Sequence, residues 1–162
     1  MRRVGNSYLL KSPVNVVLTS HTPERLFVER LLETDNAAAL RAWIKAPDVG
    51  FYPIEYGYQP GGNGRSKRGQ FNPDFFMLGE GTDEIVVVET KADEDFSDTN
   101  VGKLAYADAY FAKLNELLKA KRNKRRYQFH FLSPVDYDDF FAGLRDGTLG
   151  GFVSTLQAAL SD

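Results

Sequence analysis

Residues 72–91 hold the pattern that most restricts what this chain can fold into. Two apolar runs, rich in β-branched and aromatic residues, occupy positions 75–78 and 85–88, and a short segment of Gly, Thr and Asp separates them. This arrangement is typical of a β-hairpin. Asp74 stands at the start of the first run, and Glu89 and Lys91 follow the second. We therefore predict a hairpin that gathers three charged side chains at one end of an apolar sheet.

The spacing of these charged residues indicates a functional site. Side chains two positions apart on a strand project to the same face, so Glu89 and Lys91 should lie side by side, with Asp74 close to both. Charged groups in such a place cost desolvation free energy unless they are paired or hold a metal. Two carboxylates suit Mg²⁺ as hard oxygen ligands, and a nearby lysine can orient an attacking water. The structural alternative is a strand-end ion pair between Glu89 and Lys91.

Pro73-Asp74, a spacer, and Glu89-Thr90-Lys91 resemble the signature of the PD-(D/E)XK nuclease superfamily. In that family the Asp and the Glu bind a divalent metal, and the Lys assists the nucleophilic water. The resemblance implies Mg²⁺, with Mn²⁺ as a substitute, held by Asp74, Glu89 and the backbone carbonyl of Thr90. We expect the matching fold class, which is α/β: a restriction-endonuclease-like mixed central β-sheet flanked by α-helices.

A first helix is expected over residues 22–34, with Thr22 as N-cap and Pro23 at the first helical position. At 100° per residue, Glu24 falls on the apolar face of this helix. Many members of the resembled superfamily place an additional metal-binding or water-orienting Glu on their first helix, which makes Glu24 a candidate for both roles. The alternative is a first-turn acid that interacts favourably with the helix dipole.

The remaining elements follow from periodicity and from turn residues. We predict a short helical stretch at 37–40, strands at 43–46, 51–58 and 127–132, a long helix at 97–121, and two short helices at 137–145 and 151–160. The chain of 162 residues is expected to form a single domain spanning 1–162. Residues 1–20 would be an N-terminal arm with a possible edge strand at 14–18, and the helices within 133–162 would pack on the domain.

Composition excludes several kinds of site. The chain has no cysteine and only two histidines, so disulfides, thiolate metal sites and a histidine-rich zinc site are not expected. No stretch has the length of a transmembrane helix, and the N-terminus lacks the apolar core of a signal peptide. We expect a cytoplasmic protein without a membrane partner.

Charge is distributed unevenly along the chain. The net charge is −2, yet residues 101–130 carry eight Lys or Arg against two acidic side chains, whereas residues 133–162 carry five Asp against one Arg. Lys121 and Arg122 belong to a dense basic run at 119–126 that can contact phosphates or simply be a solvated helix end. Lys103 lies on the edge of the apolar face of the long helix, where it can reach a scissile phosphate or extend into solvent.

A glycine-rich basic segment at 60–69 carries Arg65, Lys67 and Arg68. It does not fit the Walker pattern and it precedes a strand rather than a helix, so nucleotide hydrolysis is not expected. The three cations can grip a DNA backbone. The alternative is a solvated connection between two strands.

Most of the chain, from Thr22 onward, is similar to the C-terminal endonuclease domain of type III restriction enzymes and related DEAD/DEAH-type helicase-nucleases. The segments that carry the likeness are 22–27, 72–75, 88–91, 100–106, 130–134 and 137–141. This resemblance implies a DNA substrate, an ATP-dependent helicase or translocase motor in the same or a partner chain, and a methyltransferase subunit as a further partner. The chain itself has no motor motifs.

These observations lead to the hypothesis of a Mg²⁺-dependent DNA endonuclease that hydrolyses phosphodiester bonds. Two alternatives stay open. One is a non-catalytic nucleic-acid-binding or assembly module of the same fold, which would bind DNA in a salt-sensitive, metal-independent way. The other is a nuclease that acts on branched DNA or on RNA.

Overall fold

The computed structural model describes residues 2–3, 16–60 and 65–161. Its main element is a four-stranded sheet with the strand order β3-β6-β7-β8. The strands are β3 (Leu40–Lys45), β6 (Phe75–Gly79), β7 (Glu84–Thr90) and β8 (Arg126–Leu132). β6 pairs antiparallel with both β3 and β7, and β7 pairs parallel with β8. The predicted α/β class with a mixed central sheet is confirmed.

The predicted hairpin is formed by β6 and β7. Phe75 is paired with Val88, and the antiparallel ladder continues from there toward the turn. The turn includes Gly81, whose φ of 69° lies in the left-handed region that glycine adopts without strain. Because the strands are closed at this turn, Asp74 and Glu89 lie at the opposite, open end of the hairpin.

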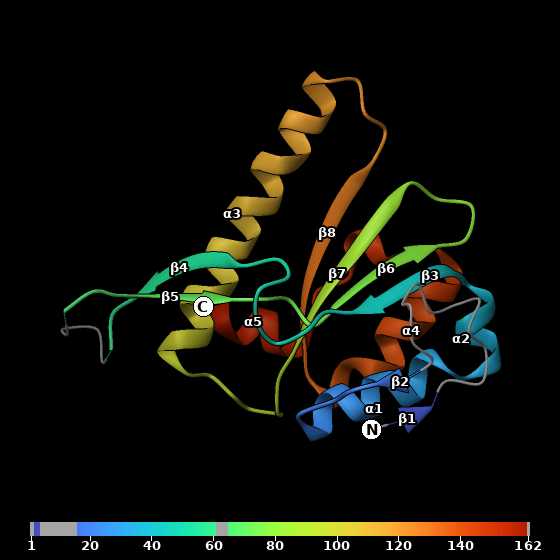
Figure 1. The fold of residues 1–162 in the computed structure, drawn as a ribbon, viewed down its shortest axis with the longest axis horizontal. Helices are drawn as coiled ribbons and strands as arrows, with labels where there is room; N and C mark the ends of the chain where they lie inside the picture. The colour runs from blue at the N-terminus through green and yellow to red at the C-terminus, as the bar shows by residue number, and fades with distance from the viewer. Residues whose placement is uncertain (1, 4–15, 61–64, 162) are drawn as a thin grey trace.

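A long helix, α3 (Asp98–Ala120), connects the parallel strands β7 and β8. Ser97 is its N-cap residue, and the helix matches the range predicted from the sequence. It buries Leu104, Ala107 and Phe111, which recur at intervals of three and four residues. In Figure 1 the helix rises beside β8 and extends to the far end of that strand.

Helices cover both faces of the sheet (Figure 1). One face packs against α1 (Thr22–Leu31), α2 (Thr34–Ala38) and α4 (Tyr137–Asp146) in a core that includes Phe27, Phe75 and Phe140. The other face packs against α3 and α5 (Thr155–Ser161) in a second core, which includes Val87 and Phe131. Two short 3₁₀ helices, η1 (Pro134–Asp136) and η2 (Leu149–Gly151), connect the C-terminal elements. The C-terminal segment is thus part of both cores.

The strands β4 (Ile54–Tyr58) and β5 (Lys67–Phe71) form a separate antiparallel hairpin. This corrects the expectation of one strand over 51–58 that leads into the catalytic hairpin. The β4–β5 hairpin packs against α3 at a close approach of two backbones: a Cβ atom placed on Gly102 would lie 2.6 Å from the carbonyl oxygen of Gly57. Only glycine at position 102 allows the hairpin to lie this close to the helix.

Several predicted boundaries need correction. His21, and not Thr22, is the N-cap residue of α1, which ends at Leu31 rather than at Thr34. The expected helical stretch at 37–40 is α2, which begins and ends earlier, at Thr34–Ala38. The expected edge strand at 14–18 is β2 (Val16–Val17), which pairs with β1 (Arg2–Arg3) and not with the central sheet; residues 4–15 lie outside the described part. In the described part of the chain, no helix combines the length and apolar character needed to cross a bilayer.

Candidate active site

Asp74 and Glu89 meet at the open end of the β6–β7 hairpin. Asp74 is one residue before β6, and continuing the register of Phe75 with Val88 by one step places it opposite Glu89. Side chains directly opposite each other on an antiparallel pair share a face. The Oδ2 atom of Asp74 accepts hydrogen bonds from the backbone N–H of Thr90 at 2.7 Å and from the Thr90 hydroxyl at 2.6 Å. Thr90 therefore fixes the Asp74 carboxylate beside the strand that carries Glu89.

Glu89 is buried between two lysines. Its Oε1 atom lies 2.7 Å from Nζ of Lys91 and 3.6 Å from Nζ of Lys103, and its side chain is only 4% exposed. Its Oε2 atom is also buried, and no described residue donates a hydrogen bond to it. Leaving a buried carboxylate oxygen without a donor or a cation is costly. One oxygen of Glu89 is thus paired with lysine, and the other has no partner among the described residues.

Aromatic rings line the two lysines. Nζ of Lys91 lies 5.9 Å from the ring centroid of Phe131, and Nζ of Lys103 lies 5.3 Å from that of Phe71 and 5.9 Å from that of Tyr56. These contacts place both ammonium groups over ring faces, where the π electrons attract a cation. Lys103 comes from the second turn of α3 and Lys91 from the residue after β7. The site therefore unites the hairpin, the long helix and the β4–β5 hairpin.

The structure adds a residue that the sequence did not indicate. Nζ of Lys45, at the end of β3, lies 3.3 Å from Oε1 of Glu24 and 3.8 Å from Oδ1 of Asp74. It is 3.2 Å from Oδ1 of Asp48 and 3.0 Å from the backbone carbonyl oxygen of Ala46. Glu24 is buried, as predicted, but Lys45 is its charged partner. The only sequence signal for Lys45 was a lysine at the end of an apolar strand.

The pKa values follow from burial and from the neighbouring charges. Burial raises the pKa of Asp74, and the negative charge of Glu89 raises it further, while the hydrogen bonds from Thr90 act in the opposite direction. Burial lowers the pKa of Lys91, but the charge of Glu89, the hydrogen bond with it and the charge of Asp74 together outweigh burial, and the net pKa is raised. For Lys103 burial dominates and Lys91 repels it, so its pKa is lowered. The two carboxylates thus repel each other, and a shared cation would relieve that repulsion.

Asp74 and Glu89 at this end of the sheet are oxygen donors of the type that hard divalent cations select. The oxygens in position are the Asp74 carboxylate and Oε2 of Glu89, and the Thr90 carbonyl is the further donor that the resemblance implies. Mg²⁺ is commonly bound by one or two carboxylates and keeps several waters, so two acids suffice. The described residues contain no group of three or more His, Cys, Asp or Glu side chains arranged to hold a metal, and Glu24 is paired with Lys45 instead.

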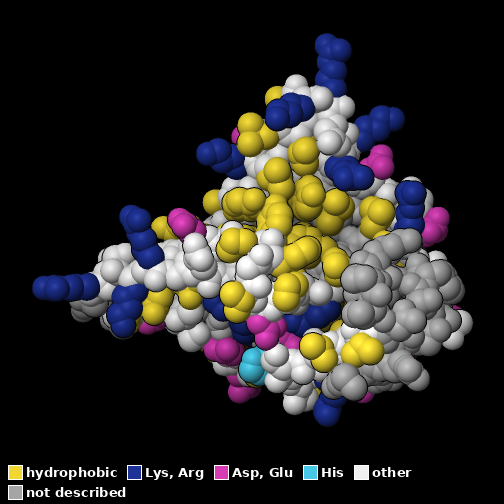
Figure 2. Space-filling view, viewed as in Figure 1, with side chains coloured by type: hydrophobic (Ala, Val, Ile, Leu, Met, Phe, Trp, Pro, Cys, Tyr) yellow, Lys and Arg dark blue, Asp and Glu magenta, His cyan; other side chains and the backbone are white. Residues whose placement is uncertain are grey.

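The predicted DNA-binding residues lie in three places. Lys103 is at the site, whereas Arg65, Lys67 and Arg68 are exposed on or next to β5. Lys121 and Arg122 are exposed past the end of α3. Lys121 follows Lys103 by 18 residues, which corresponds to about 27 Å along a helix. Figure 2 shows Lys and Arg side chains at the end of the β4–β5 hairpin and at the tip of α3, with hydrophobic side chains between α3 and the sheet.

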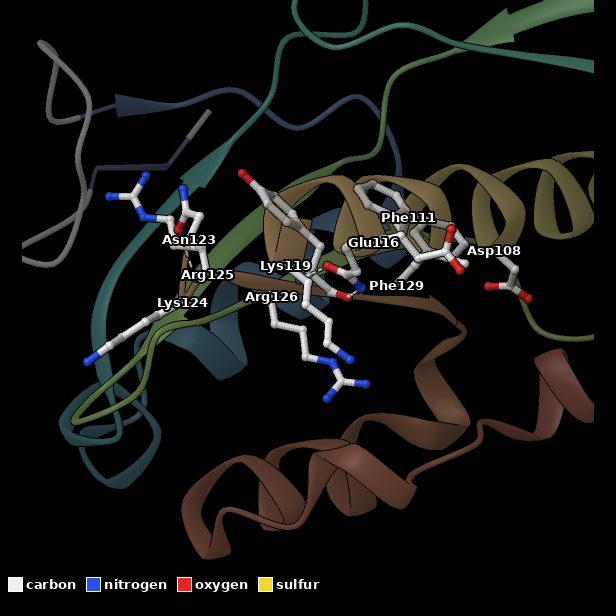
Figure 3. A pocket seen from close by; sticks show the side chains of 12 residues that line it. Asp108, Phe111, Glu116, Lys119, Asn123, Lys124, Arg125, Arg126 and Phe129 are labelled. Atoms are coloured by element: carbon white, nitrogen blue, oxygen red, sulfur yellow. Dashed lines mark hydrogen bonds between the residues drawn. The ribbon is translucent and has the colours of Figure 1, made fainter. Parts of the chain in front are cut away.

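A pocket lies away from the carboxylates, between α3 and β8. It has a volume of ≈ 630 Å³, and it is lined by aromatic residues, among them Phe111 and Phe129, and by basic ones. Figure 3 shows Lys119 and Arg126 extending together on one side, while Lys124 and Arg125 point elsewhere. This pocket adds a second cationic surface but contains none of the predicted catalytic residues.

Comparisons with known proteins give no match. No protein-family model, no curated protein and no solved structure is similar to this chain at a significant level.

Proposed function

We propose that this protein is a Mg²⁺-dependent nuclease that hydrolyses phosphodiester bonds in DNA. The observation that carries the proposal is the environment of Glu89: one oxygen is paired with Lys91, the other is buried without a donor, and Asp74 lies on the neighbouring strand. A bound cation would satisfy the unpartnered oxygen and reduce the repulsion between the two carboxylates. Mn²⁺ is expected to substitute for Mg²⁺.

Each residue has a distinct role in the proposed reaction. Asp74, Glu89 and the carbonyl of Thr90 hold the cation, which when bound supplies Lewis-acid stabilisation of the charge that develops on the phosphoryl oxygens. Lys91 is cationic at neutral pH and donates to the attacking water, which it positions against the phosphorus. Lys103 donates to a non-bridging oxygen of the scissile phosphate. Thr90 also keeps Asp74 in place through its hydroxyl and N–H groups.

The distribution of cations supports a long polyanionic substrate. Arg65, Lys67 and Arg68 lie on the β4–β5 hairpin, which packs against the helix that supplies Lys103. Exposed Lys and Arg bind the phosphate backbone without reading the base sequence. A DNA backbone that lies against this hairpin would pass next to the carboxylates. Recognition of a specific sequence would have to come from elsewhere.

The sequence segments that resemble type III restriction endonuclease domains extend the proposal to the biological setting. The chain would act as the cleavage domain of a restriction or related helicase-nuclease defence system in the cytoplasm. An ATP-dependent motor, in the same or a partner chain, would deliver DNA to it, and a methyltransferase subunit would protect host DNA.

A second candidate function is favoured by one observation. Lys45, Lys91 and Lys103 already neutralise Glu24, Asp74 and Glu89, so the cluster is balanced without a metal. This is what a non-catalytic nucleic-acid-binding or assembly module would need. Such a module would bind DNA equally well with and without Mg²⁺.

The test is cleavage of supercoiled plasmid, branched DNA and RNA in Mg²⁺, Mn²⁺ or EDTA. We expect plasmid nicking that requires the metal and falls by at least about 100-fold in Asp74→Asn and in Glu89→Gln. Glu80→Gln is the matched control, because Glu80 is an exposed acid at the opposite end of the same hairpin. A wild-type rate in Asp74→Asn contradicts the proposal. DNA binding by the wild type without cleavage and without metal dependence supports the second candidate. A preference for branched DNA or for RNA would change the proposed substrate from plain duplex DNA to that nucleic acid.

A further inference from the structure

The ammonium group of Lys45 is surrounded by oxygen atoms of the kind that bind a metal cation. Four oxygen atoms lie within 4 Å of its Nζ: Oε1 of Glu24, Oδ1 of Asp48, Oδ1 of Asp74 and the carbonyl oxygen of Ala46. Three of these are carboxylate oxygens and one is a backbone carbonyl. Such an all-oxygen set is the type that hard divalent cations select. The side chain of Lys45 is only 7% exposed, so the ammonium group is enclosed by its partners.

Asp74 divides its two oxygens between two neighbourhoods. Oδ2 accepts the hydrogen bonds from Thr90, next to the strand that carries Glu89, and Oδ1 faces Lys45 and, through it, Glu24. A carboxylate in this position can bridge two cations, as in two-metal hydrolases. On the Glu89 side a bound metal would relieve a buried free oxygen. On the Glu24 side the ammonium group of Lys45 already provides a positive charge.

We infer that Lys45 is a tethered substitute for a second metal ion, and that the site therefore takes a single divalent cation, between Asp74 and Glu89. This inference rests on the proposed nuclease function. Lys45 is a positioning residue: it holds Asp74 and Glu24 through charge and does not touch the substrate.

The surroundings of Lys45 resist its displacement by a metal. The ammonium group of Lys45 lies within 4 Å of three carboxylate oxygens, which hold it in place by charge. Glu24 has little freedom to turn toward another ligand, because its Oε2 atom accepts a hydrogen bond from the backbone N–H of Ser20 at 2.7 Å. Ser20 also donates its hydroxyl to Asp48 at 2.7 Å, which fixes a further Lys45 partner.

The inference is tested by the number of Mn²⁺ ions bound, measured by calorimetry and by electron paramagnetic resonance on the full chain with MnCl₂ alone. We expect one site in the wild type, which Glu89→Gln abolishes. Lys45→Met removes the tethered cation and leaves Glu24 and Asp74 unneutralised, so a second Mn²⁺ site should appear. Adding Glu24→Gln to Lys45→Met should return the number to one. Lys113→Met, an exposed lysine in the middle of α3, should keep one site.

Each other outcome has a definite meaning. Two sites in the wild type, with metal-dependent cleavage, overturn the role of Lys45 and leave the nuclease proposal standing. A folded Lys45→Met that binds a single Mn²⁺ overturns it as well, and circular dichroism verifies the fold. No Mn²⁺ site and no metal-dependent cleavage in the wild type refute the proposed function itself. If Lys45→Met does not fold, the stoichiometry of the wild type still decides between one and two cations.

Discussion

Nζ of Lys91 lies 2.7 Å from Oε1 of Glu89, two residues earlier in the chain, and the other oxygen of the same carboxylate is buried without a donor from the described residues. The ion pair thus restrains Glu89 without using its full capacity to bind. A lysine in this place can neutralise the acid when no ligand is bound and donate to a water when one is. The following predictions test this relationship and the contacts around it.

Lys91→Met should reduce DNA cleavage by about 100-fold or more, because positioned proton donors and acceptors contribute factors of that size. Lys103 remains beside Glu89, so the fold should be retained. Plasmid nicking in Mg²⁺ measures the rate, and thermal unfolding verifies the fold. Lys113→Met is the control. Cleavage by Lys91→Met at a rate within twofold of the wild type would remove Lys91 from the mechanism.

Thr90→Val should lower the free energy of unfolding by about 1–2 kcal/mol, because it removes a hydroxyl that donates to a largely buried carboxylate. The pKa of Asp74 should rise further, since this hydroxyl favours the charged form. The pH at which metal-dependent activity begins should therefore move upward. Urea unfolding and a pH–rate profile measure the two effects. Thr90→Ser, which keeps the hydroxyl, should resemble the wild type in both.

Gly102→Ala should detach or displace the β4–β5 hairpin. The added Cβ would lie 2.6 Å from a backbone oxygen of Gly57, which is held in a strand and cannot rotate away. Overpacking of this kind costs about 1–3 kcal/mol, against a gain of about 1 kcal/mol in helix propensity. We expect a net loss of stability, together with weaker DNA binding. Gly151→Ala, where an added Cβ meets nothing within 4 Å, is the control; equal stabilities of the two variants would contradict the close packing.

The β4–β5 hairpin, with Arg65, Lys67 and Arg68, should contribute to the salt dependence of DNA binding. Each phosphate contact that is lost should reduce the slope of log K against log salt by about 0.9 for duplex DNA. The triple change to Gln should therefore reduce the slope by up to about 3 units. Lys121→Gln with Arg122→Gln is the comparison at the far end of α3. A triple variant with an unchanged slope would mean that the β4–β5 hairpin does not contact DNA.

His130 should make the protein less stable in mild acid. Burial lowers its pKa from 6.5 to about 4, so the unfolded chain binds a proton between these values when the folded chain does not. Above pH 6.5 His130 is neutral in both states and does not lower the free energy of unfolding. As the pH falls from 6.5 toward 4, the unfolded chain takes up the proton first, and the free energy of unfolding decreases. At pH 5 the loss is about 2 kcal/mol relative to neutral pH. Denaturant unfolding at pH 7.5 and pH 5 should show a smaller difference in His130→Gln; an equal difference would exclude this origin.

Sequence reasoning succeeded where the signal was local. The two apolar runs and the turn that contains Gly81 define the β6–β7 hairpin, and the recurrence of Leu104, Ala107 and Phe111 defines α3. The position of Asp74 opposite Glu89 followed from the hairpin, because strand pairing brings residues on either side of a turn together.

It failed where the outcome depended on tertiary contacts. Lys45 is separated from Glu24 by 21 positions and from Asp74 by 29, so no periodicity could pair them. The β4–β5 hairpin is set apart from the central sheet by its packing on α3, and that packing depends on a single glycine in the helix.

β7 lies between β6 and β8 and is hydrogen-bonded to both. Glu89 itself pairs with Phe131 of β8, and the ladder with β6 ends one residue earlier at Val88, so the backbone at Glu89 is held on both sides of the strand and is the least mobile part of the cluster. Any adjustment to ligands of different size has to come from the periphery, from Asp74 just ahead of its strand or from Lys103 on its helix. Engineering of this protein should accordingly keep the central strand intact and vary its margins.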